Sequence, residues 1–208
     1  MIPAVHALVR IASVSSVDHS GPLPAWAAAT LARAPWAIVR RARPEKNSIA
    51  IGIRGACRNQ RLACFVGMNH VLEVRTPAEL LRAWQEKGSP FEENAAPWRA
   101  LQQAAQAWSF VDFAWGPAGS VGYSLATGQD HCSAASDLDL IVKLPHPISR
   151  EEASRFLQVL PASAVRFDIL AETPHCGFRL AEYAMVSGKI LLRTPDGPRL
   201  GCNPWSLS

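Results

Sequence analysis

Residues 114–143 read AWGPAGSVGYSLATGQDHCSAASDLDLIVK and join a turn of small residues to an apolar strand that carries two acids. The turn covers residues 116–120, and the two acids are Asp137 and Asp139. Side chains alternate between the faces of a strand, so these carboxylates point the same way, roughly 7 Å apart along the backbone. Because two desolvated carboxylates repel each other, a divalent cation is the expected remedy. Carboxylate oxygens are ligands that suit Mg²⁺, and we predict a magnesium site here.

The small-residue turn supplies chemistry that complements the acids. Its backbone N–H groups and the hydroxyl of Ser120 suit a polyphosphate. A further acid, Asp168, lies in an apolar strand predicted over residues 164–170. Three carboxylates on neighbouring strands match a two-metal phosphoryl-transfer site, in which two hold the metals and the third helps to activate a hydroxyl. The predicted catalytic and metal-binding residues are therefore Asp137, Asp139 and Asp168, and the predicted substrate-binding residues beside them are Gly119, Ser120 and Lys143.

Composition limits the class of protein. The chain has 208 residues, of which 49% are hydrophobic and 18% charged, which is enough for a sizeable core. A net charge of +4 favours acidic partners. The five cysteines form no C-x-x-C pair, which indicates reduced thiols and a cytoplasmic protein. Residues 1–14 predict a first strand rather than a signal peptide, and no apolar run approaches the roughly 18–20 residues that span a bilayer. We therefore expect no membrane association.

The order of predicted elements indicates two domains. An N-terminal α+β domain is expected over residues 1–88, with a helix over 25–34 and strands over 36–42, 49–54 and 62–66. Thr76 and Pro77 start a helix that runs to about Lys87. The C-terminal domain is expected over residues 95–208, with buried tryptophans on a helix over 97–109 and a helix capped by Ser149. This is a mixed sheet with helices on one face.

A cluster of arginines in the N-terminal domain is a second candidate site. Arg54, Arg58 and Arg61 surround Gly55 at the end of two predicted strands. A guanidinium is planar and binds phosphate in a bidentate manner, so the cluster suits a triphosphate or an acidic carrier protein. A solvated basic loop is the alternative interpretation. We predict that these three arginines bind substrate.

Several segments together resemble a known family. They are IAIGIRGACRNQRLA, WGPAGSVGYSLATG, AASDLDLIVKLP, FDILAETP and KILLRTPDGPRL, followed by NPW. The G-S, D-x-D and later single-D signature resembles the nucleotidyltransferase fold. More narrowly, the chain is similar to the malonate decarboxylase holo-acyl-carrier-protein synthases, also called phosphoribosyl-dephospho-CoA transferases. In this chain 17 positions separate Ser120 from Asp137, and we expect an inserted hairpin over residues 121–136.

The resemblance implies a reaction and its partners. The family is implied to use Mg²⁺ and the donor triphosphoribosyl-dephospho-CoA. It is implied to transfer the phosphoribosyl-dephospho-CoA group to a serine of the apo acyl carrier protein of malonate decarboxylase, with release of pyrophosphate. On this interpretation Asp137 and Asp139 hold the metal and Asp168 is the third acid. The implied fold is a nucleotidyltransferase-like α+β domain preceded by a smaller α+β domain.

Two other functions fit the residues alone. The same acids would serve a magnesium-dependent nucleotidyltransferase that uses an ordinary nucleoside triphosphate, and only the resemblance separates the two. A non-catalytic basic module that binds acidic protein or nucleic acid is the third hypothesis. The three acids argue against it, because carboxylates at a phosphate-binding site are unfavourable without a metal. We therefore do not expect nucleic acid as a partner.

Overall fold

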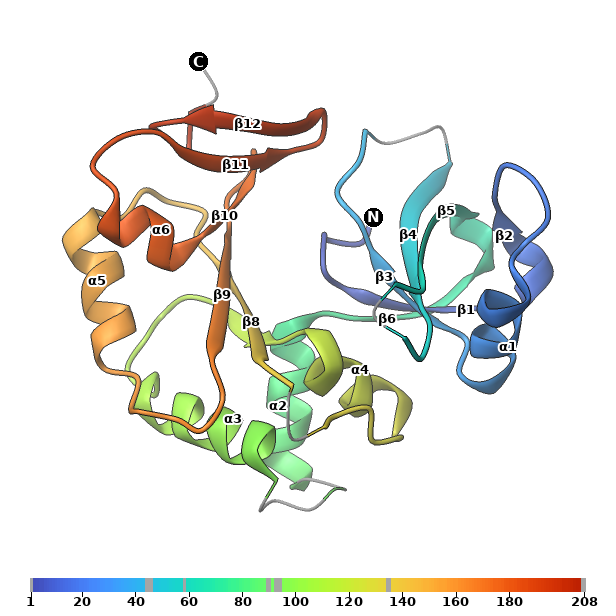
Figure 1. Cartoon of the computed structure of the whole chain (residues 1–208), viewed down its shortest axis with the longest axis horizontal. Helices are drawn as coiled ribbons and strands as arrows, with labels where there is room; N and C mark the ends of the chain where they lie inside the picture. Colours follow the sequence, from blue (N-terminus) through green and yellow to red (C-terminus); the bar gives the residue numbers. More distant parts are fainter. Residues whose placement is uncertain are drawn as a thin grey trace. The chain divides into compact units, whose positions relative to one another are not determined.

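The computed structural model describes residues 2–43, 47–57, 59–88, 91, 95–133 and 136–206. By its internal contacts the chain divides into two compact units, Met1–Thr76 and Pro77–Ser208, and each is described by itself. Helices and β-sheets occur in both units (Figure 1), so the predicted α+β class is confirmed. Among the residues described, no helix has the length and hydrophobicity that crossing a bilayer requires.

The N-terminal unit is built on a six-stranded antiparallel sheet with the order β2-β5-β4-β3-β1-β6. The predicted strands over residues 36–42, 49–54 and 62–66 are confirmed as β3, β4 and β5, and the predicted helix is α1. The elements of this unit are β1 (Leu8–Ile11), η1 (Val14–Ser16), β2 (Val17–Asp18), α1 (Ala25–Arg33), β3 (Trp36–Val39), β4 (Ser48–Arg54), β5 (Arg61–Gly67), η2 (Met68–His70) and β6 (Val71–Arg75).

Alternation along the strands gives this sheet one apolar face. In β4 the residues Ile49, Ile51 and Ile53 are buried, and they join Ala27 and Leu31 of α1 in one hydrophobic core. The other face carries Ala50 and Gly52, which alternate with the isoleucines, and the exposed Arg54 that ends the strand. The sheet therefore has a core face and a face with small and basic side chains.

The C-terminal unit contains a second six-stranded sheet, with the order β12-β11-β10-β9-β8-β7. Strands β8 and β9 are parallel and are joined by the crossover helix α5, whereas the other neighbours are antiparallel. The elements are α2 (Pro77–Lys87), α3 (Ala96–Ala107), β7 (Trp115–Pro117), α4 (Gly119–Thr127), β8 (Leu138–Lys143), α5 (Arg150–Gln158), β9 (Phe167–Glu172), β10 (Gly177–Arg179), α6 (Leu180–Met185), β11 (Ile190–Thr194) and β12 (Gly197–Gly201).

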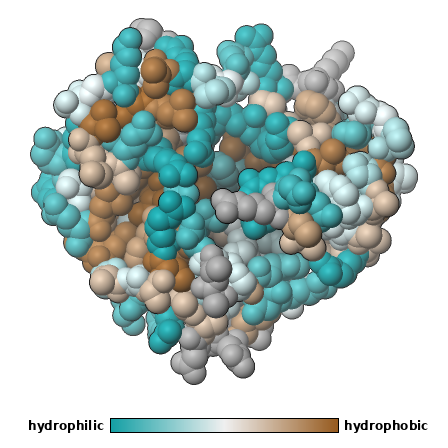
Figure 2. Space-filling model, in the orientation of Figure 1, coloured by the Kyte–Doolittle hydropathy of each residue, from teal (hydrophilic) through white to brown (hydrophobic). Residues whose placement is uncertain are grey.

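The core of this unit lies between one face of the sheet and several helices. Leu138 and Leu140 of β8 are fully buried there, together with Leu180 of α6. Trp98 and Trp108 are 1% and 2% exposed, which confirms that the predicted tryptophan pair belongs to the core. The space-filling view in Figure 2 shows hydrophobic residues on the surface over this unit. The exposed large hydrophobic side chains of the unit include Met185, Leu191 and Leu200.

The division between the units falls before α2, whereas the sequence prediction sets it after residue 88. The physical reason is a close contact inside the C-terminal unit. A Cβ on Gly116 of β7 would lie 1.9 Å from the carbonyl oxygen of Pro77. Only glycine permits such an approach, so the start of α2 is fixed against β7. The predicted helix from Pro77 to Lys87 is itself confirmed.

Helix α4 replaces an expected hairpin. The sequence prediction puts a turn at residues 116–120 and a hairpin over 121–136, and both predictions are wrong. The segment forms β7, then α4 from Gly119 to Thr127. Gly128 ends the helix in the left-handed conformation with φ +70°. A glycine at this position is a common helix terminator and was the signal in the sequence for a helix.

Candidate active site

The three predicted acids lie at the beginnings of two neighbouring parallel strands. Asp137 directly precedes β8, Asp139 is its second residue, and Asp168 is the second residue of β9. Asp139 and Asp168 are register partners in the parallel pair. Paired strands lie about 4.8 Å apart, so these two side chains rise from adjacent positions of one sheet face. The structure thus brings the predicted acids to one edge of the sheet.

The start of α4 packs directly against Asp139. The Ala118 amide donates to the carbonyl oxygen of Asp139 at 2.9 Å. Gly119 has φ +55°, and a Cβ there would lie 1.9 Å from Oδ2 of Asp139. This position therefore needs glycine both for its backbone conformation and for space. Ser120, on the first turn of α4, is 8% exposed.

Two arginines that the sequence prediction missed complete this edge. Arg166 Nη2 donates to Oδ2 of Asp137 at 2.6 Å and lies 4.0 Å from Oδ2 of Asp168. Arg179 Nη2, from β10, donates to the same Asp168 oxygen at 3.1 Å. The Asp137 carboxylate raises the pKa of the Arg166 guanidinium above its usual range. Arg166 could have been found from sequence, because it precedes Asp168 by two residues and so shares its side of the strand.

The carboxylates have the chemistry of a magnesium site, but in this structure two of them form ion pairs with arginines. Among the residues described, no group of three or more His, Cys, Asp or Glu side chains is gathered closely enough to hold a metal ion. Asp137 and Asp168 instead pair with Arg166 and Arg179. Their side chains are 43% and 23% exposed, so an ion can reach them from solvent. Carboxylate oxygens of this type are ligands that Mg²⁺ prefers.

Lys143 and Glu172 lie at the opposite ends of the same two strands. They are register partners, and Glu172 is 3% exposed. Glu172 is buried because β9 extends to that residue. Lys143 follows Asp139 by four positions, or about 13 Å along a strand. The structure therefore does not bring Lys143 to the acids.

The predicted basic cluster lies in the N-terminal unit, at the end of the β4–β5 hairpin. Arg54 and Arg61 are register partners and both are exposed. The connecting loop is closed by a hydrogen bond from the Gly55 amide to the Gln60 carbonyl at 2.8 Å. Arg58, the third predicted member, falls outside the residues that the structure describes.

The segment before residue 206 has a structural role. The carbonyl oxygen of Pro204 accepts a hydrogen bond from Thr173 Oγ1 at 3.0 Å. Trp205 Nε1 donates to the carbonyl oxygen of Leu144 at 2.9 Å, and its ring contacts Phe178. These contacts tie residues 204–205 to the chain just beyond the ends of β8 and β9.

Acids on adjacent parallel strands, with a glycine-led helix packed against one of them, have the kind of chemistry that phosphoryl transfer requires. The chain belongs to the phosphoribosyl-dephospho-CoA transferase family. Residues 4–77 match the family model described as "Phosphoribosyl-dephospho-CoA transferase MdcG N-terminal domain", and residues 81–204 match "Phosphoribosyl-dephospho-CoA transferase MdcG C-terminal domain". The family predicted from sequence is thus confirmed, and the protein is a transferase.

Relatives from several bacteria extend over most of the chain. A protein of Pseudomonas putida named phosphoribosyl-dephospho-CoA transferase is 37% identical over 208 residues, covering 99% of this chain and 96% of its own. One of Pseudomonas putida strain W619 with the same name is 39% identical, covering 88% and 87%. One of Klebsiella pneumoniae strain 342 is 34% identical, covering 91% and 92%. No solved structure matches the chain.

Proposed function

We propose that the protein transfers the phosphoribosyl-dephospho-CoA group from triphosphoribosyl-dephospho-CoA to a serine of the apo acyl carrier protein of malonate decarboxylase, with release of pyrophosphate. The family models and the names of the relatives support the transferred group. The carrier protein, the pyrophosphate and the magnesium ion are our proposals, and they follow from the resemblance of the sequence segments and from the acids.

The observation that carries the proposal is the position of Asp139. It faces Asp168 across a parallel strand pair, and the first turn of α4 lies against its carboxylate. The first N–H groups of a helix have no intrahelical acceptor and attract anions. A helix start beside carboxylates thus offers a phosphate-binding group and a metal-binding group at one point.

Asp137, Asp139 and Asp168 would hold the metal ion. When bound, Mg²⁺ would supply positive charge beside the reacting phosphoryl oxygens and the leaving pyrophosphate. The carboxylates of Asp137 and Asp168 would then have to turn from their arginines toward the cation. Both ion pairs are partly exposed to solvent, and such pairs are weak.

The residues of the chain would bind and orient the reactants. The amides of Gly119 and Ser120 would donate to phosphate oxygens of the donor. The carrier serine oxygen would attack the α-phosphorus, so that an oxygen–phosphorus bond to the serine forms while the bond to the pyrophosphate breaks. Asp168 would accept the proton of the serine hydroxyl. The pyrophosphate leaves with the electron pair of the broken bond.

The paired arginines of the N-terminal unit would bind an anionic partner. Like charges directly opposite one another destabilise an antiparallel pair, and Arg54 and Arg61 are such a pair. An anion between them would remove this repulsion. Phosphates of the donor and acidic side chains of the carrier protein both have the required chemistry.

Intact-mass spectrometry tests the proposed reaction. The apo carrier protein is incubated with this protein, Mg²⁺ and triphosphoribosyl-dephospho-CoA, and a parallel tube contains ATP as the only donor. We expect a mass gain equal to the phosphoribosyl-dephospho-CoA group that EDTA abolishes and that Asp139→Asn removes. A nucleotidyl adduct in the ATP tube alone would instead favour a nucleotidyltransferase of ordinary nucleotides.

A further inference from the structure

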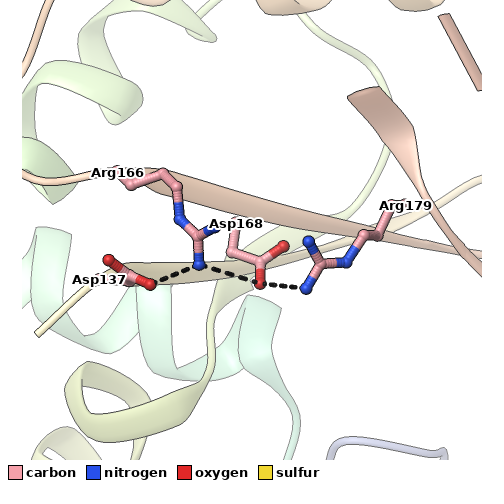
Figure 3. A network of polar contacts seen from close by, with 4 residues as sticks. All are labelled: Asp137, Arg166, Asp168 and Arg179. Carbon is pink, nitrogen blue, oxygen red and sulfur yellow. Dashed lines mark hydrogen bonds and ion pairs between the residues drawn. The ribbon is translucent and has the colours of Figure 1, made fainter. Parts of the chain in front are cut away.

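Four charged side chains at the candidate active site form an alternating row (Figure 3). Asp137 pairs with Arg166, Arg166 lies within reach of Asp168, and Asp168 pairs with Arg179. The distances from nitrogen to oxygen are 2.6, 4.0 and 3.1 Å in that order. Neither arginine is needed to explain the fold, because both guanidinium groups lie at the surface with side chains 63% and 47% exposed.

Each of these guanidinium groups has hydrogen-bond donors to spare. A guanidinium carries five N–H donors in a planar fork. Arg166 uses the single nitrogen Nη2 toward both carboxylates, and Arg179 uses Nη2 toward one. The side-chain hydrogen bonds of Arg166 and Arg179 go to the carboxylates of Asp137 and Asp168. The remaining donors can therefore bind an anion that arrives from solvent.

Binding of a divalent cation would reverse the net charge of this group of side chains, from −1 to +1. Three carboxylates, of Asp137, Asp139 and Asp168, face two guanidinium groups. A divalent cation held by the carboxylates would leave both guanidinium groups without their counter-charges. A polyphosphate supplies negative charge and oxygens in the geometry that arginine binds best. Metal and polyphosphate should then bind together, each improving the site for the other.

We propose that Arg166 and Arg179 form a diphosphate-binding site, which Asp137 and Asp168 occupy until a divalent cation draws these carboxylates away. The inference rests on the proposed function for the source of the ligand, which is the terminal diphosphate of the donor and, after transfer, free pyrophosphate. Arg166 and Arg179 are thus substrate-binding residues, and the two ion pairs are the resting state of the site.

A purely structural role for the arginines makes the opposite prediction. If Arg166 and Arg179 served to orient the carboxylates, their removal would weaken the binding of a metal ion. If they compete with the metal, their removal strengthens it, because a cation no longer has to displace a guanidinium. The sign of the change in metal affinity therefore separates the two roles.

The experiment compares the wild type with the double variant Arg166→Gln/Arg179→Gln. Arg155→Gln is the matched control, since Arg155 is an exposed arginine of α5 in the same unit. Mn²⁺ binding is measured by electron paramagnetic resonance with the metal alone. Calorimetry then measures the binding of inorganic pyrophosphate in the presence of Mg²⁺ and, in a second arm, of triphosphoribosyl-dephospho-CoA against dephospho-CoA. Thermal melting checks that each variant is folded.

We expect the double variant to bind Mn²⁺ about three- to tenfold more tightly, the size expected for weak exposed pairs. Pyrophosphate should bind it at least about tenfold more weakly, because charge-assisted hydrogen bonds are lost. Weaker Mn²⁺ binding, or pyrophosphate binding equal to that of the Arg155 control, would overturn the proposal. The measurements with the donor identify the source of the diphosphate. If the double variant loses equal affinity for the donor and for pyrophosphate, the site binds the diphosphate of the donor. If it loses affinity for pyrophosphate alone, the site binds the product.

None of these measurements requires the carrier protein. A protein that binds pyrophosphate through these arginines but transfers no group to the carrier would contradict the proposed function and leave this inference standing. If the group is transferred but pyrophosphate binding does not depend on the two arginines, the proposed function stands and this inference is contradicted.

Discussion

Replacing Gly119 by alanine should damage the active site far more than it damages the fold. A Cβ at this position would lie 1.9 Å from Oδ2 of Asp139. The shortest distance for an ordinary van der Waals contact of a Cβ is 3.4 Å. The carboxylate would have to move by about 1.5 Å, the difference between these two distances. A misplacement of roughly 1 Å in a reacting group can cost about a hundredfold in rate. We therefore expect the transfer rate to fall at least about a hundredfold.

The backbone contribution to this effect can be measured separately, because α4 offers a matched control. Gly119 and Gly128 have φ +55° and φ +70°, so alanine costs roughly 1–2 kcal/mol at either position. Nothing lies within 4 Å of a Cβ on Gly128. Gly128→Ala should lower the melting temperature by about 2–4 °C for each kcal/mol and leave the transfer rate unchanged.

The assay is the rate of mass gain of the apo carrier protein under saturating donor, measured beside a thermal melt for both variants. We expect a moderate loss of stability for both variants and a loss of rate for Gly119→Ala alone. Equal rates for the two alanine variants would refute it, because the position of the Asp139 carboxylate would then not matter for the reaction.

Three further predictions concern single features. Asp139→Asn keeps the size of the side chain and removes its charge. Transfer should therefore be lost, while the melting temperature stays within a few degrees of the wild type. Transfer at the wild-type rate would exclude Asp139 as a metal ligand. Arg54→Gln with Arg61→Gln removes like charges that face each other, so the free energy of unfolding should rise by about 0.2–1 kcal/mol in urea titrations. The same variant should weaken carrier or donor binding and reduce its salt dependence, and an unchanged salt dependence would contradict an anion site there. Ser149→Ala breaks the capping box with Glu152 and should lower the free energy of unfolding by about 0.5–2 kcal/mol without changing the transfer rate. A large loss of rate would show that α5 has a role in the reaction as well as in the fold.

Local signals in the sequence predicted much of the fold. Ser149 and Glu152 form the expected capping box, and Pro77 starts the expected helix. Each of these features depends on neighbours within four residues, which the sequence displays directly. The acids were also predictable, because strand alternation puts Asp137 and Asp139 on one side before any partner strand is known.

Features set by contacts between distant segments could not be predicted. The attachment of α2 to the C-terminal unit depends on Gly116, far along the chain. Arg179 reaches Asp168 only because β10 pairs with β9 in a particular register. Contacts between segments far apart in the chain give no recognisable pattern in a single sequence.

The hydrogen bonds of residues 204–205 have a consequence for synthesis on the ribosome. The sheet of the N-terminal unit is complete once β6 has been made, so this unit can fold while the rest of the chain is still being translated. The sheet of the C-terminal unit differs, because Trp205 and Pro204 form hydrogen bonds with Leu144 and Thr173, next to the ends of β8 and β9. These strands acquire their final contacts only after residue 205 has left the exit tunnel. Nascent chains that stop earlier therefore carry a complete N-terminal unit and an incomplete C-terminal unit.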